Sequence, residues 1–196
     1  MQAQSNQVGL QTLSPQTYRT GAWVGIASIV MLFTGLSSAY VVRSGSSTDW
    51  QALSAPRALW ISTSLILVSS LTFEIARRAL KRRNIDTYNR WLFVTAILGL
   101  CFLAAQFMAW RQLVARGIYL VSNPHSSFFF VLTGAHGVHL LGGILALNYL
   151  MFRAWRRNGG AWPQDKKEAV TDAVAIYWHF MDGLWVYLFL LLFLWR

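Results

Sequence analysis

Residues 91 to 110, WLFVTAILGLCFLAAQFMAW, form an apolar stretch without a single charged side chain. A helix of about 20 such residues is as long as the hydrocarbon core of a bilayer is thick. Four other stretches are long and apolar enough to do the same, at about 21 to 42, 58 to 79, 128 to 152 and 174 to 195. The sequence therefore predicts an all-α integral membrane protein, built as a bundle of five transmembrane helices.

The composition agrees with this class. Of the 196 residues, 55% are hydrophobic and only 12% are charged, which is too little polar surface for an ordinary soluble domain. The single cysteine, Cys101, allows neither an internal disulfide nor a metal site built on cysteine pairs. The links between the apolar stretches are too short to hold a separate domain. We therefore expect one membrane domain at residues 21–196, preceded by a polar segment at residues 1–20. No removable signal peptide is expected.

The basic residues predict which way the chain faces. Twelve of the 17 Lys and Arg residues fall on the side of the amino terminus and of the second and fourth links, and five fall on the other side. Since basic residues concentrate in cytoplasmic loops, we expect the amino terminus inside and the carboxyl terminus outside. Basic flanks such as ARRALKRRN (76–84) also suit anionic lipid, so the net charge of +10 requires no nucleic-acid partner.

Ionisable side chains inside predicted spans are the residues most informative about function. They are Glu74, His136, His139, His179 and Asp182. Each costs a few kcal/mol if it faces lipid, so each is expected to face protein, water or a headgroup. Glu74 lies about one turn from two arginines, which favours either ion pairing or proton exchange with the cytoplasm. Asp182 follows His179 by one turn and shares its face, so His179 is expected to bond to Asp182 or to a neighbouring helix.

The histidines in LTGAHGVHLLGG (132–143) raise the possibility of a redox centre. His136 and His139 share one helix face, and a haem would need one of them opposite His179. A non-haem iron site would add a carboxylate. However, a span that begins at residue 174 places His179 only about 8 Å from the cytoplasmic start of its helix, far from the depth of the other two. We therefore favour imidazoles that bond across a packed bundle.

Five stretches resemble, in the same order, the helices of subunit III of the haem-copper terminal oxidases. They are SSAYVVRSG (37–45), LVSSLTFEIA (67–76), WLFVTAILGLCFLAAQ (91–106), FFFVLTGAHGVHLLGG (128–143) and YWHFMDGLWVYLF (177–189). The pattern LTGxHGxHxxxG, followed some 35 residues later by YWHFxDxxW, is the most specific part. The resemblance covers nearly the whole chain. It implies a five-helix form of this subunit, without the two extra amino-terminal helices of longer members.

The resemblance implies a supporting role in a proton-pumping respiratory oxidase of a bacterial-type inner membrane. Haem and copper are expected in partner subunits I and II, and neither a catalytic residue nor a metal or cofactor site is expected in this chain. It is expected to pack on subunit I, to hold phospholipids, and to support proton uptake and stable turnover. Glu74 is assigned to the intramembrane carboxylate of the family. Structural or lipid-contact roles are implied for the remaining polar residues of the motifs: Arg77, His136, His139, Trp178, His179 and Asp182.

Three alternatives remain open. The first is the subunit III-like protein that accompanies nitric oxide reductases, which is similar in topology and motifs. The second is an independent membrane haem b protein that carries electrons through His139 and His179. The third is a proton or ion carrier that uses Glu74. The resemblance does not specify whether cytochrome c or quinol donates electrons to the expected oxidase.

Overall fold

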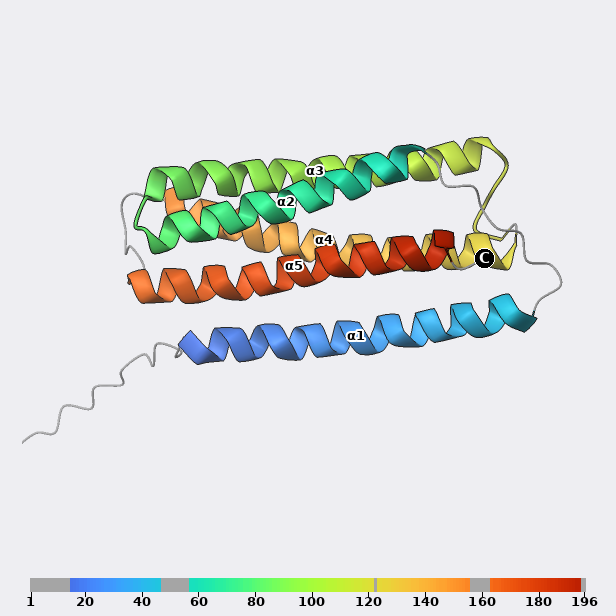
Figure 1. Ribbon diagram of the computed structural model, residues 1–196, viewed down its shortest axis with the longest axis horizontal. Helices are drawn as coiled ribbons and strands as arrows, with labels where there is room; N and C mark the ends of the chain where they lie inside the picture. The colour runs from blue at the N-terminus through green and yellow to red at the C-terminus, as the bar shows by residue number, and fades with distance from the viewer. Residues whose placement is uncertain (1–14, 47–56, 122, 156–162, 195–196) are drawn as a thin grey trace, which may run out of the picture.

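The computed structural model describes residues 15–46, 57–121, 123–155 and 163–194, and within these ranges it contains five long helices and no strand. The helices are α1 (Pro15–Ser46), α2 (Arg57–Lys81), α3 (Ile85–Ala115), α4 (Pro124–Trp155) and α5 (Gln164–Leu194). Figure 1 shows that the five helices lie side by side with their axes along one common direction. All five are long and apolar enough to cross a membrane, which confirms the predicted all-helical architecture.

The ends of α3 show how local sequence sets the turns. Asn84 caps the start of the helix, where its side-chain oxygen accepts a hydrogen bond from the Thr87 backbone N–H at 3.1 Å. At the other end Gly117 has a φ of 78°, a left-handed conformation that glycine adopts without steric cost. The Ile118 N–H then bonds to the Leu113 carbonyl, which closes the helix. Both turns bring the next helix back antiparallel.

Helices α2 to α5 form the main bundle, and α1 lies along its side against α4 and α5 (Figure 1). The centre of the bundle is aromatic, with Trp178 and Trp185 of α5 almost completely buried. Glycines make room for these rings. A Cβ atom on Gly99 of α3 would lie 2.8 Å from the Trp178 ring, and one on Gly143 of α4 would lie 3.2 Å from it. Small residues therefore allow three helices to meet around one indole.

The helices extend beyond the predicted spans, most of all at the start of α5. This helix begins at Gln164, ten residues before the predicted boundary at residue 174. The additional turns carry charged side chains, which lower hydropathy but do not stop a helix. His179 therefore lies about 22 Å from the start of its helix, and the expectation of about 8 Å was wrong. Hydropathy detects the apolar part of a helix rather than its first residue.

The polar amino-terminal segment predicted at residues 1–20 is described only in part. Residues 1–14 lie outside the described residues, and residues 15–20 already belong to α1. The direction in which the five helices cross the bilayer stays a prediction from the positions of Lys and Arg.

Candidate functional site

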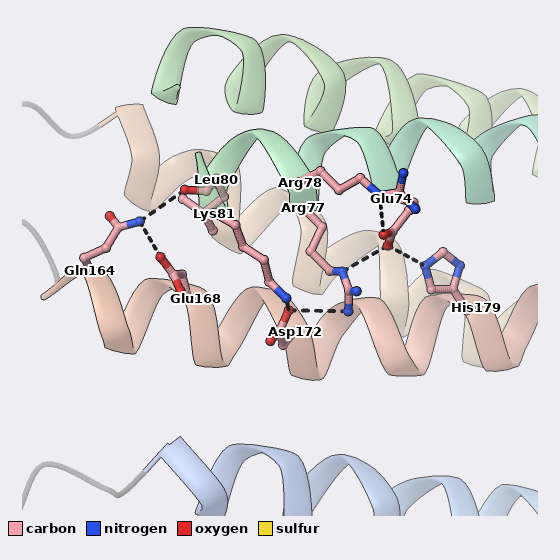
Figure 2. A network of polar contacts seen from close by, with 9 residues as sticks. All are labelled: Glu74, Arg77, Arg78, Leu80, Lys81, Gln164, Glu168, Asp172 and His179. Atoms are coloured by element: carbon pink, nitrogen blue, oxygen red, sulfur yellow. Dashed lines mark hydrogen bonds and ion pairs between the residues drawn. The ribbon is translucent and has the colours of Figure 1, made fainter. Parts of the chain in front are cut away.

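A strip of polar side chains joins the last turns of α2 to the first half of α5 (Figure 2). We call it the polar strip. It consists of Glu74, Arg77, Arg78 and Lys81 of α2 and Gln164, Glu168, Asp172 and His179 of α5. Residues three or four positions apart share one face of a helix, which is why the members line up along each helix.

Glu74 lies between two guanidinium groups of its own helix. Its Oε2 is 3.0 Å from Arg77 Nε, and its Oε1 is 2.9 Å from Arg78 Nε. His179 of α5 approaches from the other side, with Nε2 at 4.0 Å from Glu74 Oε2. The Glu74 side chain is 27% exposed, so it is not sealed inside the bundle. The structure thus brings Glu74 to the cations expected from the sequence and to one of the predicted histidines.

A second carboxylate continues the polar strip toward the start of α5. Asp172 Oδ1 is 3.5 Å from Arg77 Nη1 and 4.0 Å from Lys81 Nζ, so Arg77 bridges two carboxylates on different helices. Gln164 donates a hydrogen bond to Glu168 at 2.7 Å and another to a backbone carbonyl of α2. Partly exposed pairs of this kind contribute at most about 1 kcal/mol each. They align the two helices more than they stabilise the fold.

His179 of α5 makes two further contacts with α2. Its Nδ1 is hydrogen-bonded to the Ser70 hydroxyl at 2.6 Å, and its ring lies against Phe73. Of the two expected partners, the structure therefore shows the neighbouring helix rather than Asp182. Asp182 is 3% exposed and lies next to Ser70. Among the described residues, neither of its carboxyl oxygens makes a hydrogen bond of good geometry.

Hydroxyl groups of α2 form further bonds to α3 and α5 that the sequence analysis missed. The bonded pairs are Trp178 Nε1 to Ser69 at 3.2 Å, Trp185 Nε1 to Thr63 at 3.1 Å, Gln106 Nε2 to Ser62 at 2.9 Å, and Thr72 with Thr95 at 2.8 Å. Bonds between polar side chains join helices in an apolar solvent. The available signal was the repetition of Ser and Thr along α2, which predicts a polar face but not its partners. Trp178, predicted as a structural or lipid-contact residue, is fully buried.

His136 occupies a sealed position at the centre of the bundle. It is 0% exposed, and its ring packs against Phe102 of α3 and Trp185 of α5, with ring centroids at 5.8 and 5.2 Å. Neither ring nitrogen has a hydrogen-bond partner among the described residues. The expected bond across the bundle is thus not present at His136, and aromatic packing holds the ring instead.

The three predicted histidines do not converge. His139 bonds through Nδ1 to the Ala135 carbonyl at 2.7 Å, and its ring lies against Phe33 of α1. His136 faces α3 and α5, whereas His179 faces α2. Across the part of the chain that the structure describes, His, Cys, Asp and Glu side chains form no group of three or more suited to a metal ion. A bis-histidine haem needs two imidazoles that face each other, and this arrangement does not provide such a pair.

Comparison with known proteins connects this arrangement to an oxidase family. The chain matches the family described as cytochrome c oxidase subunit III over residues 3–196. It is 32% identical to cytochrome c oxidase subunit 3 of Thermostichus vulcanus, over 89% of this chain and 85% of that protein. It is 29% identical to probable cytochrome c oxidase subunit 3 of Nocardia farcinica, over 89% and 86%. Quinol oxidase subunit 3 of Bacillus subtilis is 28% identical, over 86% and 82%.

Proposed function

Because this chain belongs to the cytochrome c oxidase subunit III family, we propose that it is the supporting, non-redox subunit of a proton-pumping terminal oxidase. The family match over residues 3–196 is the observation that carries this conclusion. The chain is a terminal oxidase subunit III with five helices that can span a membrane, and it is part of a multi-subunit complex.

Haem and copper belong, in this proposal, to partner subunits I and II. The directions of His136, His139 and His179 support this assignment, since each ring packs on a different neighbouring helix. The chain then contributes no catalytic group. It contributes a helical surface that packs on subunit I and holds phospholipids in a bacterial-type inner membrane, with the amino terminus inside.

The polar strip is the part of this chain that we assign to proton uptake. Glu74 Oε2 and His179 Nε2 lie 4.0 Å apart, and the two side chains are 27% and 35% exposed. Carboxylates and imidazoles at such positions take protons from water and release them to a neighbour. Arg77, which also contacts Asp172, holds the Glu74 carboxylate in place between the helices. On the cytoplasmic side, this surface would supply protons to the entrance of the catalytic subunit.

The test is to purify the complex through a tag on this chain and to identify every co-purifying subunit by mass spectrometry. We expect a large subunit with haem and a copper-binding subunit, and cytochrome c or quinol oxidase activity of the purified complex. Removal of the chain is expected to leave the haem spectrum of the complex unchanged and to reduce the number of turnovers before inactivation. A nitric oxide reductase partner, or a chain that purifies alone with stoichiometric haem, would overturn the proposal.

A further inference from the structure

A groove of about 500 Å³ lies between α1 and α5, which run side by side (Figure 1). One wall carries the hydroxyl groups of Thr34, Ser37 and Ser38 of α1, and the other wall carries Phe180 and Tyr187 of α5. The rest of its described lining is apolar, and no residue of that lining is charged. We call it the α1–α5 groove. Its volume suits a small organic molecule.

The hydroxyl groups in this groove differ from the other hydroxyl groups of α1. Four hydroxyl groups of α1 outside the groove donate to backbone carbonyls of their own helix at 2.8 to 3.2 Å, namely those of Thr20, Ser28, Ser44 and Ser46. Among the described residues, the hydroxyl groups of Thr34, Ser38 and Tyr187 make no hydrogen bond. All three side chains are exposed, so the groove offers a hydrogen-bond donor on each wall. The Ser37 hydroxyl is buried, and we do not assign it to a ligand.

The two aromatic rings of the groove also differ from other rings of α5. Trp178, Trp185 and Phe189 each pack edge-on against another aromatic ring of the bundle. Within the part of the chain that the structure describes, Phe180 and Tyr187 make no contact with another ring. Their faces can therefore stack on a planar molecule in the groove.

The depth of the hydroxyl groups restricts the ligand further. Ser38 and Thr34 lie about 6 and 12 Å before the end of the predicted span at residues 21–42. Tyr187 lies about 12 Å before the end of the predicted span at residues 174–195. Lipid phosphates lie outside the hydrocarbon core, beyond the ends of these spans. A ligand that meets the hydroxyl groups is therefore uncharged, carries acceptor oxygens and dissolves in the hydrocarbon part of the bilayer.

We propose that the α1–α5 groove binds an isoprenoid quinone. The head of a quinone is an uncharged planar ring with two carbonyl oxygens on opposite sides, and its tail is apolar. One carbonyl accepts a hydrogen bond from Thr34 or Ser38 on α1, the other accepts one from Tyr187 on α5, and the ring stacks on Phe180. We assign binding to the groove, and no electron transfer. This inference goes beyond the proposed function, since neither the packing on subunit I nor the polar strip requires a quinone.

The test is photolabelling of the purified oxidase complex with an azido-substituted short-chain quinone, with decylubiquinone as the competitor. We expect label in the peptides of this chain that contain residues 34–42 and 180–187, and we expect excess decylubiquinone to remove it. Because the label is read on peptides of this chain, a quinol site on another subunit does not affect the result. Label confined to other peptides, or label that the competitor does not remove, would overturn the proposal.

Substitutions that remove the donors and keep the groove measure their contribution. Tyr187→Phe is expected to raise the concentration of decylubiquinone that halves the label about five-fold, as for the loss of one hydrogen bond. Thr34→Val and Ser38→Ala, made together, are expected to raise it about three-fold. Ser28→Ala, which removes a hydroxyl of α1 outside the groove, is the matched control and is expected to behave as the wild type does. Equal concentrations for all of these proteins would overturn the site.

Phosphatidylcholine with a photoreactive acyl chain distinguishes a quinone from an ordinary lipid in the groove. If the groove prefers a quinone, decylubiquinone is expected to reduce the labelling of the same two peptides by this lipid several-fold. Labelling by phosphatidylcholine that decylubiquinone does not reduce would show that lipid fills the groove, and it would overturn the proposal.

Discussion

Two regions attach α5 to the rest of the bundle, and they do so by opposite means. The polar strip joins α5 to α2 through ion pairs at 3.5 to 4.0 Å, and its ion-paired side chains are between 27% and 70% exposed. The aromatic core, which we define as Phe102, His136, Trp178 and Trp185, has rings that are at most 1% exposed. Both regions contain ionisable residues that stood out in the sequence. Glu74 and His179 of the polar strip are partly exposed and paired, whereas His136 of the aromatic core is buried and has no hydrogen-bond partner among the described residues.

The difference separates partly exposed, ion-paired residues, to which we assign proton uptake, from buried residues that hold the fold. In the polar strip Arg77 contacts both Glu74 and Asp172, and Glu74 contacts both Arg77 and Arg78, so the loss of one contact leaves others, and each exposed pair contributes little. In the aromatic core the rings fill the space between three helices, and the removal of one ring leaves a cavity that no other side chain fills. Mutations are therefore expected to affect stability strongly in the core and function selectively in the strip.

The largest effect is expected for Trp185→Ala. The substitution removes a buried indole that packs on Phe102 and His136 and donates a hydrogen bond to Thr63. The free energy of unfolding in detergent micelles is expected to fall by about 3 to 5 kcal/mol, as for other buried aromatic residues replaced by alanine. Denaturation with sodium dodecyl sulfate, followed by circular dichroism, measures it.

Trp23→Ala on α1 is the control for Trp185→Ala. Trp23 is 57% exposed, and its replacement is expected to change the free energy of unfolding by no more than about 0.5 kcal/mol. If both tryptophans had similar effects, the aromatic core would not be the main attachment of α5.

An intermediate effect, of opposite sign, is expected for His136→Leu. Among the residues that the structure describes, neither buried imidazole nitrogen has a partner, so an apolar residue of similar size removes a desolvation cost. The free energy of unfolding is expected to stay the same or to rise by up to about 1 kcal/mol, with an unchanged haem content of the purified complex. A loss of stability above about 2 kcal/mol, or a loss of haem, would show that His136 has a partner in the complex.

The smallest effect on stability is expected for Glu74→Gln. The amide keeps the size of the side chain, and its single oxygen can still accept a hydrogen bond from Arg77 or from Arg78, while Asp172 still holds Arg77. The free energy of unfolding is expected to change by about 0.5 kcal/mol or less, and the complex is expected to purify with all its subunits. If Glu74 supports proton uptake, Glu74→Gln is expected to reduce the number of turnovers before inactivation. Asp172→Asn is the comparison. Failure of the complex to assemble would contradict the contrast between the two regions.

Much of the fold and part of the site were predictable from local sequence. The five helices follow from apolar stretches of bilayer length, and the pairing of Glu74 follows from cations three and four residues further along the same helix. The contribution of Asp172 was not predictable, because it depends on a helix start that charged residues hide from a hydropathy window. The acceptors of Trp178 and Trp185 on α2 were not predictable either, because those residues are more than a hundred positions away in sequence.

The sequence by itself determined that this chain is a five-helix membrane protein and, through its motifs, which family it belongs to. Helix formation in an apolar solvent is a local matter, since each backbone hydrogen bond closes within a few residues. The tertiary structure alone decided that His136 is sealed among aromatic rings, that His139 turns to α1, and that His179 meets Glu74 on α2. The rotation of each helix about its axis decides what a side chain meets, and that rotation is set by packing against distant segments.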